Sequence, residues 1–188
     1  MTRLEQAAGE VAAALSRLRV PYMLIGGLAN LQWGTLRSTA DVDLSVWVEE
    51  EHLAAVIQDL TAAFHALPAD PLAFVRESRI LPLETSSRIR VDLAFALLPY
   101  EAEAIRRAVR RKVGGATLRV CTAEDLILYK IISDRPRDLE DVRGVLRRMG
   151  RKLDRRYLDP KIKELAEALE RPEIAERWRA ALKEEGRK

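Results

Sequence analysis

The stretch from residue 22 to residue 48 constrains the fold more than any other part of the chain. It begins with an apolar run, residues 22–25, which is short enough for one buried strand. The run stops at Gly26 and Gly27, where the missing Cβ atoms let the backbone turn sharply and approach a ligand closely. Residues 28–32 can begin a helix there, so that free N–H groups point into the turn and favour an anion.

A second predicted strand, residues 41–48, opens with two aspartates. Because strand side chains alternate, Asp41 and Asp43 share one face, and the apolar residues between and after them share the other. Alone, a pair of glycines is usually only a turn, and two alternating aspartates are usually a solvated face. In this order, two carboxylates beside an anion-binding turn predict a site for metal and phosphate.

These residues resemble the signature of the polymerase-β-like nucleotidyltransferases. The resemblance comprises Gly26-Gly27, thirteen intervening residues and then Asp41-Val42-Asp43-Leu44. With Arg37-Ser38-Thr39 before the acidic pair, the sequence is most similar to the small stand-alone AbiEii-type members. The resemblance implies a nucleotidyltransferase fold with a mixed α+β sheet and a C-terminal set of helices. It also implies that Gly26, Gly27, Arg37 and Ser38 bind nucleotide, although Gly27 lacks the serine hydroxyl that many members have there.

A third carboxylate is expected from residues 88–95, which alternate as a strand does. Asp92 faces opposite to the apolar row, and the resembled family takes its third carboxylate from such a strand. The alternative for Asp92 is a polar residue on a solvated sheet face.

Lys130 is the last residue that the resemblance singles out. It lies on the apolar side of a predicted helix over residues 123–132, where a lysine must snorkel, pair with an acid or meet a ligand. The family's second motif implies that this lysine meets nucleotide phosphates. A buried ion pair with Asp138 or Asp141 is the structural alternative.

The implied reaction is nucleotidyl transfer, in which an acceptor hydroxyl attacks the α-phosphorus of a nucleoside triphosphate. Two Mg²⁺ or Mn²⁺ ions can stabilise such a displacement, and hard cations prefer carboxylate oxygens. The resemblance assigns Asp41 and Asp43 to both ions and Asp92 to the catalytic ion. Arg37 and Lys130 are the candidates that neutralise the triphosphate.

The composition fits a globular enzyme. Of the 188 residues 48% are hydrophobic and 32% are charged, which argues against disorder. The length allows a nucleotidyltransferase core over residues 1–121 with a helical region over 122–188 packed on it. No uncharged run is long enough to cross a membrane, and a single cysteine, Cys121, suits a cytoplasmic protein.

Charge is distributed unevenly. Residues 1–100 hold 8 Arg and Lys against 12 Asp and Glu, whereas residues 101–188 hold 24 against 17. Five of the basic residues come just before the turn of a predicted hairpin at Gly114-Gly115: Arg106, Arg107, Arg110, Arg111 and Lys112. They could bind RNA or tRNA, or could simply be solvated.

Several acceptors and roles remain open. The acceptor could be RNA, tRNA or a protein, within a toxin–antitoxin system, or an aminoglycoside- or lincosamide-like antibiotic. A non-catalytic, antitoxin-like regulatory protein could use the same fold, although three retained carboxylates argue against lost catalysis. Among the remaining elements, the sequence predicts a capped helix over residues 3–18, a helix over 49–64 that ends at His65, and two last helices over 160–169 and 172–183.

Overall fold

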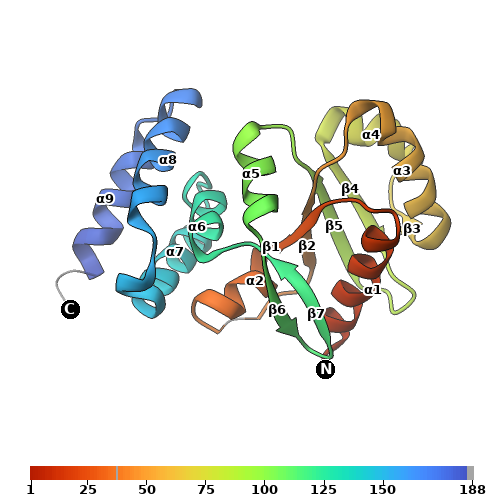
Figure 1. Cartoon of the computed structure of the whole chain (residues 1–188), viewed down its shortest axis with the longest axis horizontal. Helices are drawn as coiled ribbons and strands as arrows, with labels where there is room; N and C mark the ends of the chain where they lie inside the picture. Colours follow the sequence, from red (N-terminus) through yellow and green to blue (C-terminus); the bar gives the residue numbers. More distant parts are fainter. Residues whose placement is uncertain (37, 186–188) are drawn as a thin grey trace. The chain divides into compact units, whose positions relative to one another are not determined.

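The computed structural model describes residues 1–36 and 38–185 (Figure 1). The chain divides into two compact units. The first comprises Met1–Leu28 and Ser38–Cys121, and the second comprises Ala29–Arg37 and Thr122–Lys188. The predicted division into a nucleotidyltransferase core, residues 1–121, and a helical region, residues 122–188, remains a prediction.

The first unit is built on a mixed sheet. Within the described residues it has seven strands in the order β3-β4-β5-β2-β1-β7-β6. The two central pairs differ in direction, since β1 runs antiparallel to β2 whereas β2 runs parallel to β5. The strands are β1 (Tyr22–Ile25), β2 (Val42–Val46), β3 (His65–Ala66), β4 (Ile80–Glu84), β5 (Arg90–Phe95), β6 (Val109–Val113) and β7 (Ala116–Val120).

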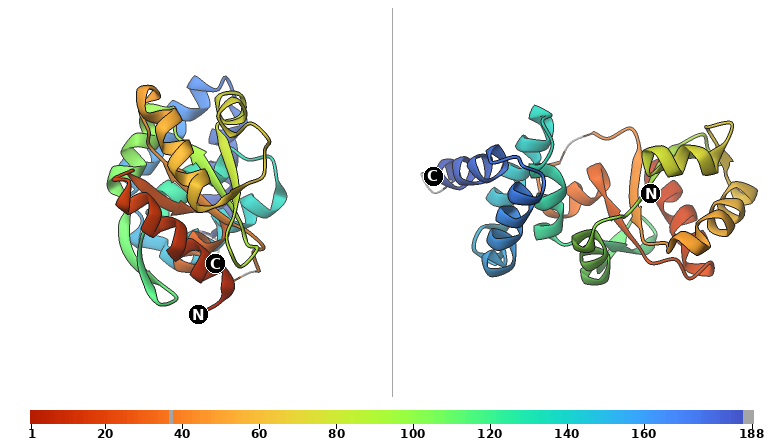
Figure 2. Two further views of the ribbon diagram at one scale, coloured as in Figure 1. Left: turned by 90° about the vertical axis from the view of Figure 1, so that its right-hand side faces the viewer. Right: turned by 90° about the horizontal axis from the view of Figure 1, so that it is seen from above.

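Helices join and cover these strands. α1 packs on β1, β2 and β7, and α3 lies beside α1 (Figure 2). The predicted capping box of α1 is present: the Glu5 backbone N–H donates to Thr2 Oγ1 at 3.2 Å, and the Thr2 N–H donates to the Glu5 carboxylate at 2.7 Å. The helices are α1 (Arg3–Arg17), α3 (Glu50–Ala63), α4 (Pro71–Ser78) and α5 (Pro99–Arg107), with α2 (Gly26–Trp33) opening directly after β1.

The segment between α3 and β4 differs from the sequence reading. His65 does not end a helix, because α3 stops at Ala63 and His65 lies in β3, paired with β4. Pro71 is the first residue of α4, a position that needs no N–H donor. Asp70 caps that helix, accepting from the Ala73 N–H at 3.0 Å.

The second unit is helical. α6 packs against α7, α8 and α9, and α9 also packs on α7 and α8. Its elements are α6 (Ala123–Ile131), α7 (Pro136–Met149), a short 3₁₀ turn (Gly150–Lys152), α8 (Arg155–Ala168) and α9 (Glu173–Glu185). No helix in the described part of the chain combines the length and the apolarity that a membrane span requires.

The start of α8 was predicted at residue 160, and this prediction was wrong. Asp154 caps the helix, since its carboxylate accepts from the N–H groups of Arg156 and Tyr157 at 3.1 and 3.2 Å. Pro160 therefore lies inside α8 and is exposed. Its ring removes one backbone hydrogen bond from the helix.

We predict that Pro160→Ala raises the free energy of unfolding, by up to about 3 kcal/mol, because it restores the missing N–H inside a helix. Pro136→Ala is the matched control: Pro136 is also exposed but is the first residue of α7, where no intrahelical bond is lost. Urea denaturation of both variants measures the difference. An equal change in the two variants would contradict the assignment of Pro160 to the helix interior.

Candidate active site

The pairing of β2 with β5 brings the predicted carboxylates together. These strands are parallel, and Asp43 and Asp92 are direct partners in the register. Partners in a sheet project to the same face, and Asp41 lies two residues before Asp43, so all three side chains share that face. The opposite face is apolar, since Val42, Leu44 and Val91 among others are fully buried.

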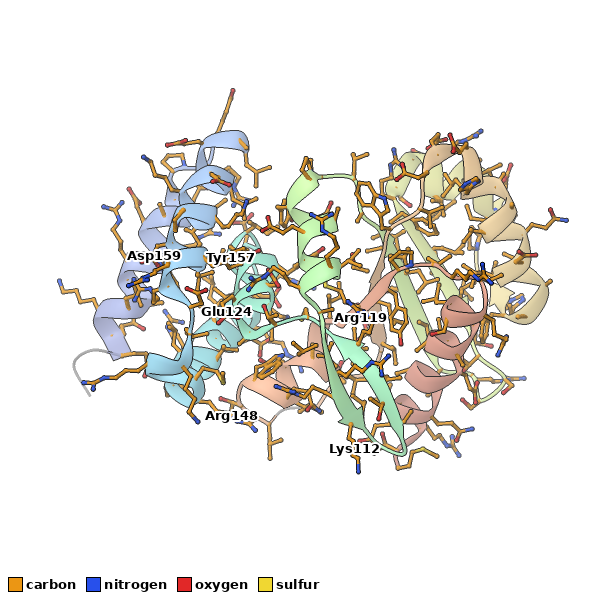
Figure 3. All side chains as sticks on the ribbon, viewed as in Figure 1. Lys112, Arg119, Glu124, Arg148, Tyr157 and Asp159 are labelled. Atoms are coloured by element: carbon orange, nitrogen blue, oxygen red, sulfur yellow. The ribbon has the colours of Figure 1, made fainter. Side chains whose placement is uncertain are left out.

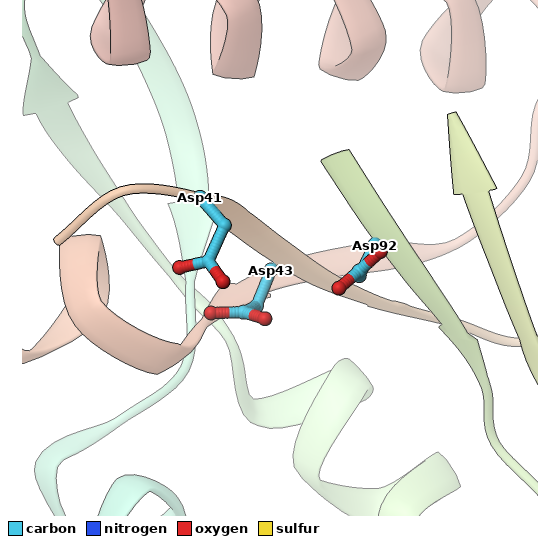
Figure 4. Close-up of side chains that lie close together, drawn as sticks. All are labelled: Asp41, Asp43 and Asp92. Atoms are coloured by element: carbon cyan, nitrogen blue, oxygen red, sulfur yellow. The ribbon is translucent and has the colours of Figure 1, made fainter. Parts of the chain in front are cut away.

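The three carboxylates are close enough to share a cation. One oxygen of each of Asp41, Asp43 and Asp92 lies within 4.8 Å of the other two (Figure 4). Opposite ligands of an octahedral Mg²⁺ stand about 4.2 Å apart, given metal–oxygen bonds of about 2.1 Å. All three side chains are partly exposed, and all their donors are hard oxygens. The set therefore fits Mg²⁺ or Mn²⁺ in size and in chemistry.

Gly26 lies next to this carboxylate cluster, and two features of its position require a glycine. Its φ is +63°, a left-handed conformation that disfavours side chains. A Cβ at this position would also lie 2.6 Å from Asp43 Cγ, because Ile25 and Asp43 are register partners. The turn between β1 and α2 is thus shaped around the Asp43 carboxylate.

Gly27 meets a residue that the sequence analysis quoted only as part of a motif. A Cβ at position 27 would lie 2.6 Å from Thr39 Cβ, so the threonine occupies the space beside the glycine. The Thr39 hydroxyl lies 3.2 Å from Asp41 Oδ1 and 3.3 Å from the Asp41 carbonyl oxygen. Ser38, before it, is exposed, and the predicted nucleotide contact Arg37 lies outside the described residues.

Arg90 is a further member of the site that the sequence analysis missed. Its Nε donates to Asp92 Oδ1 at 2.9 Å. This hydrogen bond, with the charge of Asp92 and the more distant charges of Asp41 and Asp43, raises the pKa of the Arg90 guanidinium. The strand alternation contained the signal, since residues 90 and 92 necessarily share a face.

Lys130 belongs to the second unit, where it forms the predicted ion pair. Its Nζ lies 2.5 Å from Asp138 Oδ1 and 3.0 Å from Asp141 Oδ2, and its side chain is only 8% exposed. Asp138 also accepts from Ser133 Oγ at 2.7 Å and from Arg135 Nε at 2.6 Å. Two cations thus meet two carboxylates.

Hydrogen bonding decides the charge state of this cluster. Burial by itself raises the pKa of the Asp138 carboxyl, but the hydrogen bonds from Lys130 and Ser133 outweigh it, so that the pKa lies below its ordinary value. The structure therefore bears out the ion pair that the sequence left as an alternative. A contact between Lys130 and nucleotide phosphate stays a prediction.

We predict that Lys130→Met lowers the free energy of unfolding by about 3–5 kcal/mol, because it removes the buried cation that contacts both Asp138 and Asp141 and leaves Asp138 with the exposed Arg135. The control is the same change combined with Asp138→Asn and Asp141→Asn, which removes both carboxylate charges and should recover most of the loss. Denaturant melts measure both. An unchanged stability in Lys130→Met, with weaker triphosphate binding, would instead assign the lysine to phosphate.

Comparisons with solved structures agree with the fold. An antigenic nucleotidyltransferase-like protein from Paracoccidioides brasiliensis is similar with a TM-score of 0.54 at 16% identity, covering 94% of this chain and 92% of that chain. ANT(2″)-Ia in complex with adenylyl-2″-tobramycin gives 0.53 at 16% identity, over 80% of this chain and 92% of that one. The lincomycin-bound lincosamide antibiotic adenylyltransferase LnuA gives 0.50 at 14% identity, over 77% and 96%.

The fold is therefore that of the nucleotidyltransferases, as the sequence predicts. No curated protein matches the chain. The narrower resemblance to AbiEii-type members stays a prediction. Residues 5–180 match a family described as nucleotidyl transferase of unknown function (DUF2204), and since the match spans nearly the whole sequence, the chain belongs to this family.

Proposed function

We propose that this protein is a metal-dependent nucleotidyltransferase that moves a nucleoside monophosphate from a nucleoside triphosphate to an acceptor hydroxyl. One observation supports this above the others: Asp41, Asp43 and Asp92 offer three oxygens within 4.8 Å of one another, on one sheet face and against the glycine turn that opens α2. Three clustered carboxylates repel one another, and a divalent cation relieves that repulsion.

In this proposal the three aspartates hold two Mg²⁺ or Mn²⁺ ions, which supply charge stabilisation to the attacking and leaving oxygens. A cation that binds Asp92 Oδ1 would then compete with the hydrogen bond that Arg90 donates to the same oxygen. Gly26 and Gly27 offer backbone N–H groups at the start of α2 to the triphosphate. Arg37, Ser38 and Lys130 remain the proposed nucleotide contacts of the resemblance.

The proposed reaction breaks one phosphorus–oxygen bond and forms another. The acceptor oxygen bonds to the α-phosphorus, and the bond from that phosphorus to the bridging β-phosphate oxygen breaks, so that pyrophosphate leaves. The acceptor's proton passes to a base, and Asp92 is the candidate because the resemblance assigns it to the catalytic ion.

RNA, tRNA included, is the acceptor class that the first unit favours. β6 is an edge strand of the sheet, and Arg110, Arg111 and Lys112 are exposed along it; Lys112 lies at the free end of the hairpin in Figure 3. In the described part of the chain no carboxylate pairs with Arg110 or Lys112. β6 is three strands from β2, about 14 Å at ordinary strand spacing, which a polynucleotide end can bridge.

Arg119, in strand β7 of the same hairpin, has a structural role. Its Nη2 donates to the carbonyl oxygens of Ile105 and Arg106 at 2.8 and 3.2 Å, and so it caps the C-terminal end of α5 (Figure 3). Arg119 therefore holds the hairpin to α5 and is not offered to a polyanion.

The experiments described below would also detect other roles for the protein. A protein acceptor, a place in a toxin–antitoxin system, or a non-catalytic antitoxin-like function would use the same fold. The similar antibiotic-modifying structures share the fold at 14–16% identity, and that level of identity does not transfer their substrates to this chain. An acidic acceptor pocket would favour a cationic antibiotic, whereas the exposed basic edge favours a polyanion.

We predict that Asp43→Asn abolishes Mn²⁺ binding in the presence of a nucleoside triphosphate, and lowers transfer at least a hundred-fold, while the fold melts normally. Each labelled nucleoside triphosphate is incubated with Mg²⁺, protein and total cell extract, and the labelled molecule is identified. Asp59→Asn, an exposed aspartate of α3, is the matched control and should behave as wild type. Equal labelling by Asp43→Asn and wild type would refute the site.

We predict that RNA binding weakens steeply with salt, and that Arg110→Gln with Lys112→Gln flattens the slope of log K against log salt by roughly 1.4–1.8 units. The double variant Arg151→Gln/Lys152→Gln removes the same charge from exposed positions of the second unit and should leave the slope unchanged. No RNA binding at low salt would remove RNA as the acceptor and leave nucleotidyl transfer standing.

A further inference from the structure

Thr39 is placed between the two halves of the candidate site. Its side chain fills the space beside Gly27, where a Cβ would lie 2.6 Å from Thr39 Cβ and 3.2 Å from Thr39 Cγ2. Its hydroxyl also reaches the Asp41 carboxylate at 3.2 Å. One hydroxyl therefore stands between a cation-binding carboxylate and the turn that opens α2.

The bonds of this hydroxyl are weak. At 3.2 and 3.3 Å, both are long for an O–H donor, whose usual distance to an acceptor is about 2.7–2.8 Å. A single proton also serves both Asp41 oxygens. Because a hydroxyl hydrogen turns freely about the C–O bond, Thr39 can redirect its proton when a better acceptor arrives, and an anionic oxygen is a better acceptor.

We propose that the Thr39 hydroxyl donates to a phosphate oxygen of the bound nucleoside triphosphate, above Gly27. Position 27 is then glycine because Thr39 supplies the polar group at that point. The inference rests on the proposed function and deepens it, since it names a substrate contact at the same site. Thr39 binds substrate in this scheme and takes no proton.

The geometry allows a test in which the hydroxyl is moved from position 39 to position 27. Thr39→Val keeps the branched shape and removes the hydroxyl, and Thr39→Ser keeps the hydroxyl. Gly27→Ser alone places a side chain against Thr39. Gly27→Ser combined with Thr39→Gly removes the Cβ at position 39, and so clears that contact, and it offers a hydroxyl from the turn itself.

The measurement is the dissociation constant of a nucleoside triphosphate with Mn²⁺, beside the constant for Mn²⁺ alone. Thr39→Val should weaken triphosphate binding about ten-fold to a hundred-fold, the range for a hydrogen bond to a charged group, and leave Mn²⁺ binding unchanged. Thr39→Ser should stay within about three-fold of wild type. The combined variant should bind the triphosphate at least about five-fold better than Thr39→Val.

Three results would overturn the inference. The first is equal triphosphate binding by Thr39→Val and wild type. The second is a parallel loss of Mn²⁺ binding without nucleotide, which would mean that Thr39 only orients Asp41. The third is a combined variant as weak as Thr39→Val. If wild type itself bound no triphosphate, the proposed function would fail as well, so the two failures are distinguishable.

Discussion

The candidate site depends on one pairing, that of β2 with β5. Because the two strands are parallel and Asp43 faces Asp92 across them, two carboxylates from distant parts of the sequence project side by side. Like charges in that relation destabilise a sheet. Antiparallel β1, on the other side of β2, brings Gly26 against Asp43, and only a residue without a Cβ leaves room there. The acid cluster and the glycine turn are therefore consequences of the same three strands.

Much of this was predictable from the sequence, because strand alternation and glycine chemistry are local. The faces of Asp41, Asp43 and Asp92, the cap at Thr2 and the hairpin at Gly114-Gly115 need only a few neighbouring residues, and all are present as expected. The elements that the sequence analysis did not predict depend on pairing with a distant strand, or contain a proline at a position where a helix was expected to start. β3 is two residues long and exists through its pairing with β4, and Pro160 lies inside a helix that Asp154 begins.

Two site residues escaped the sequence analysis for different physical reasons. The bond from Arg90 to Asp92 follows from alternation, and a stricter use of that rule would have found it. The place of Thr39 beside Gly27 depends on how the chain returns from α2 to β2, which no local pattern specifies. Lys130 shows the converse: its position on an apolar helix face implied a partner, and the packing of α6 against α7 brings to it both of the acids that the sequence offered, Asp138 and Asp141.

The two charged clusters differ in composition. Around Lys130, the cations Lys130 and Arg135 contact the carboxylates of Asp138 and Asp141 at 3.0 Å or less. At the candidate site three carboxylates gather, and Arg90 donates to one of them, Asp92. Carboxylates this close repel one another, and a divalent cation would relieve that repulsion. A second ion would then bind chiefly with the triphosphate, whose own negative charge it shares, so metal and nucleotide affinities should be coupled and each should raise the other by the same factor.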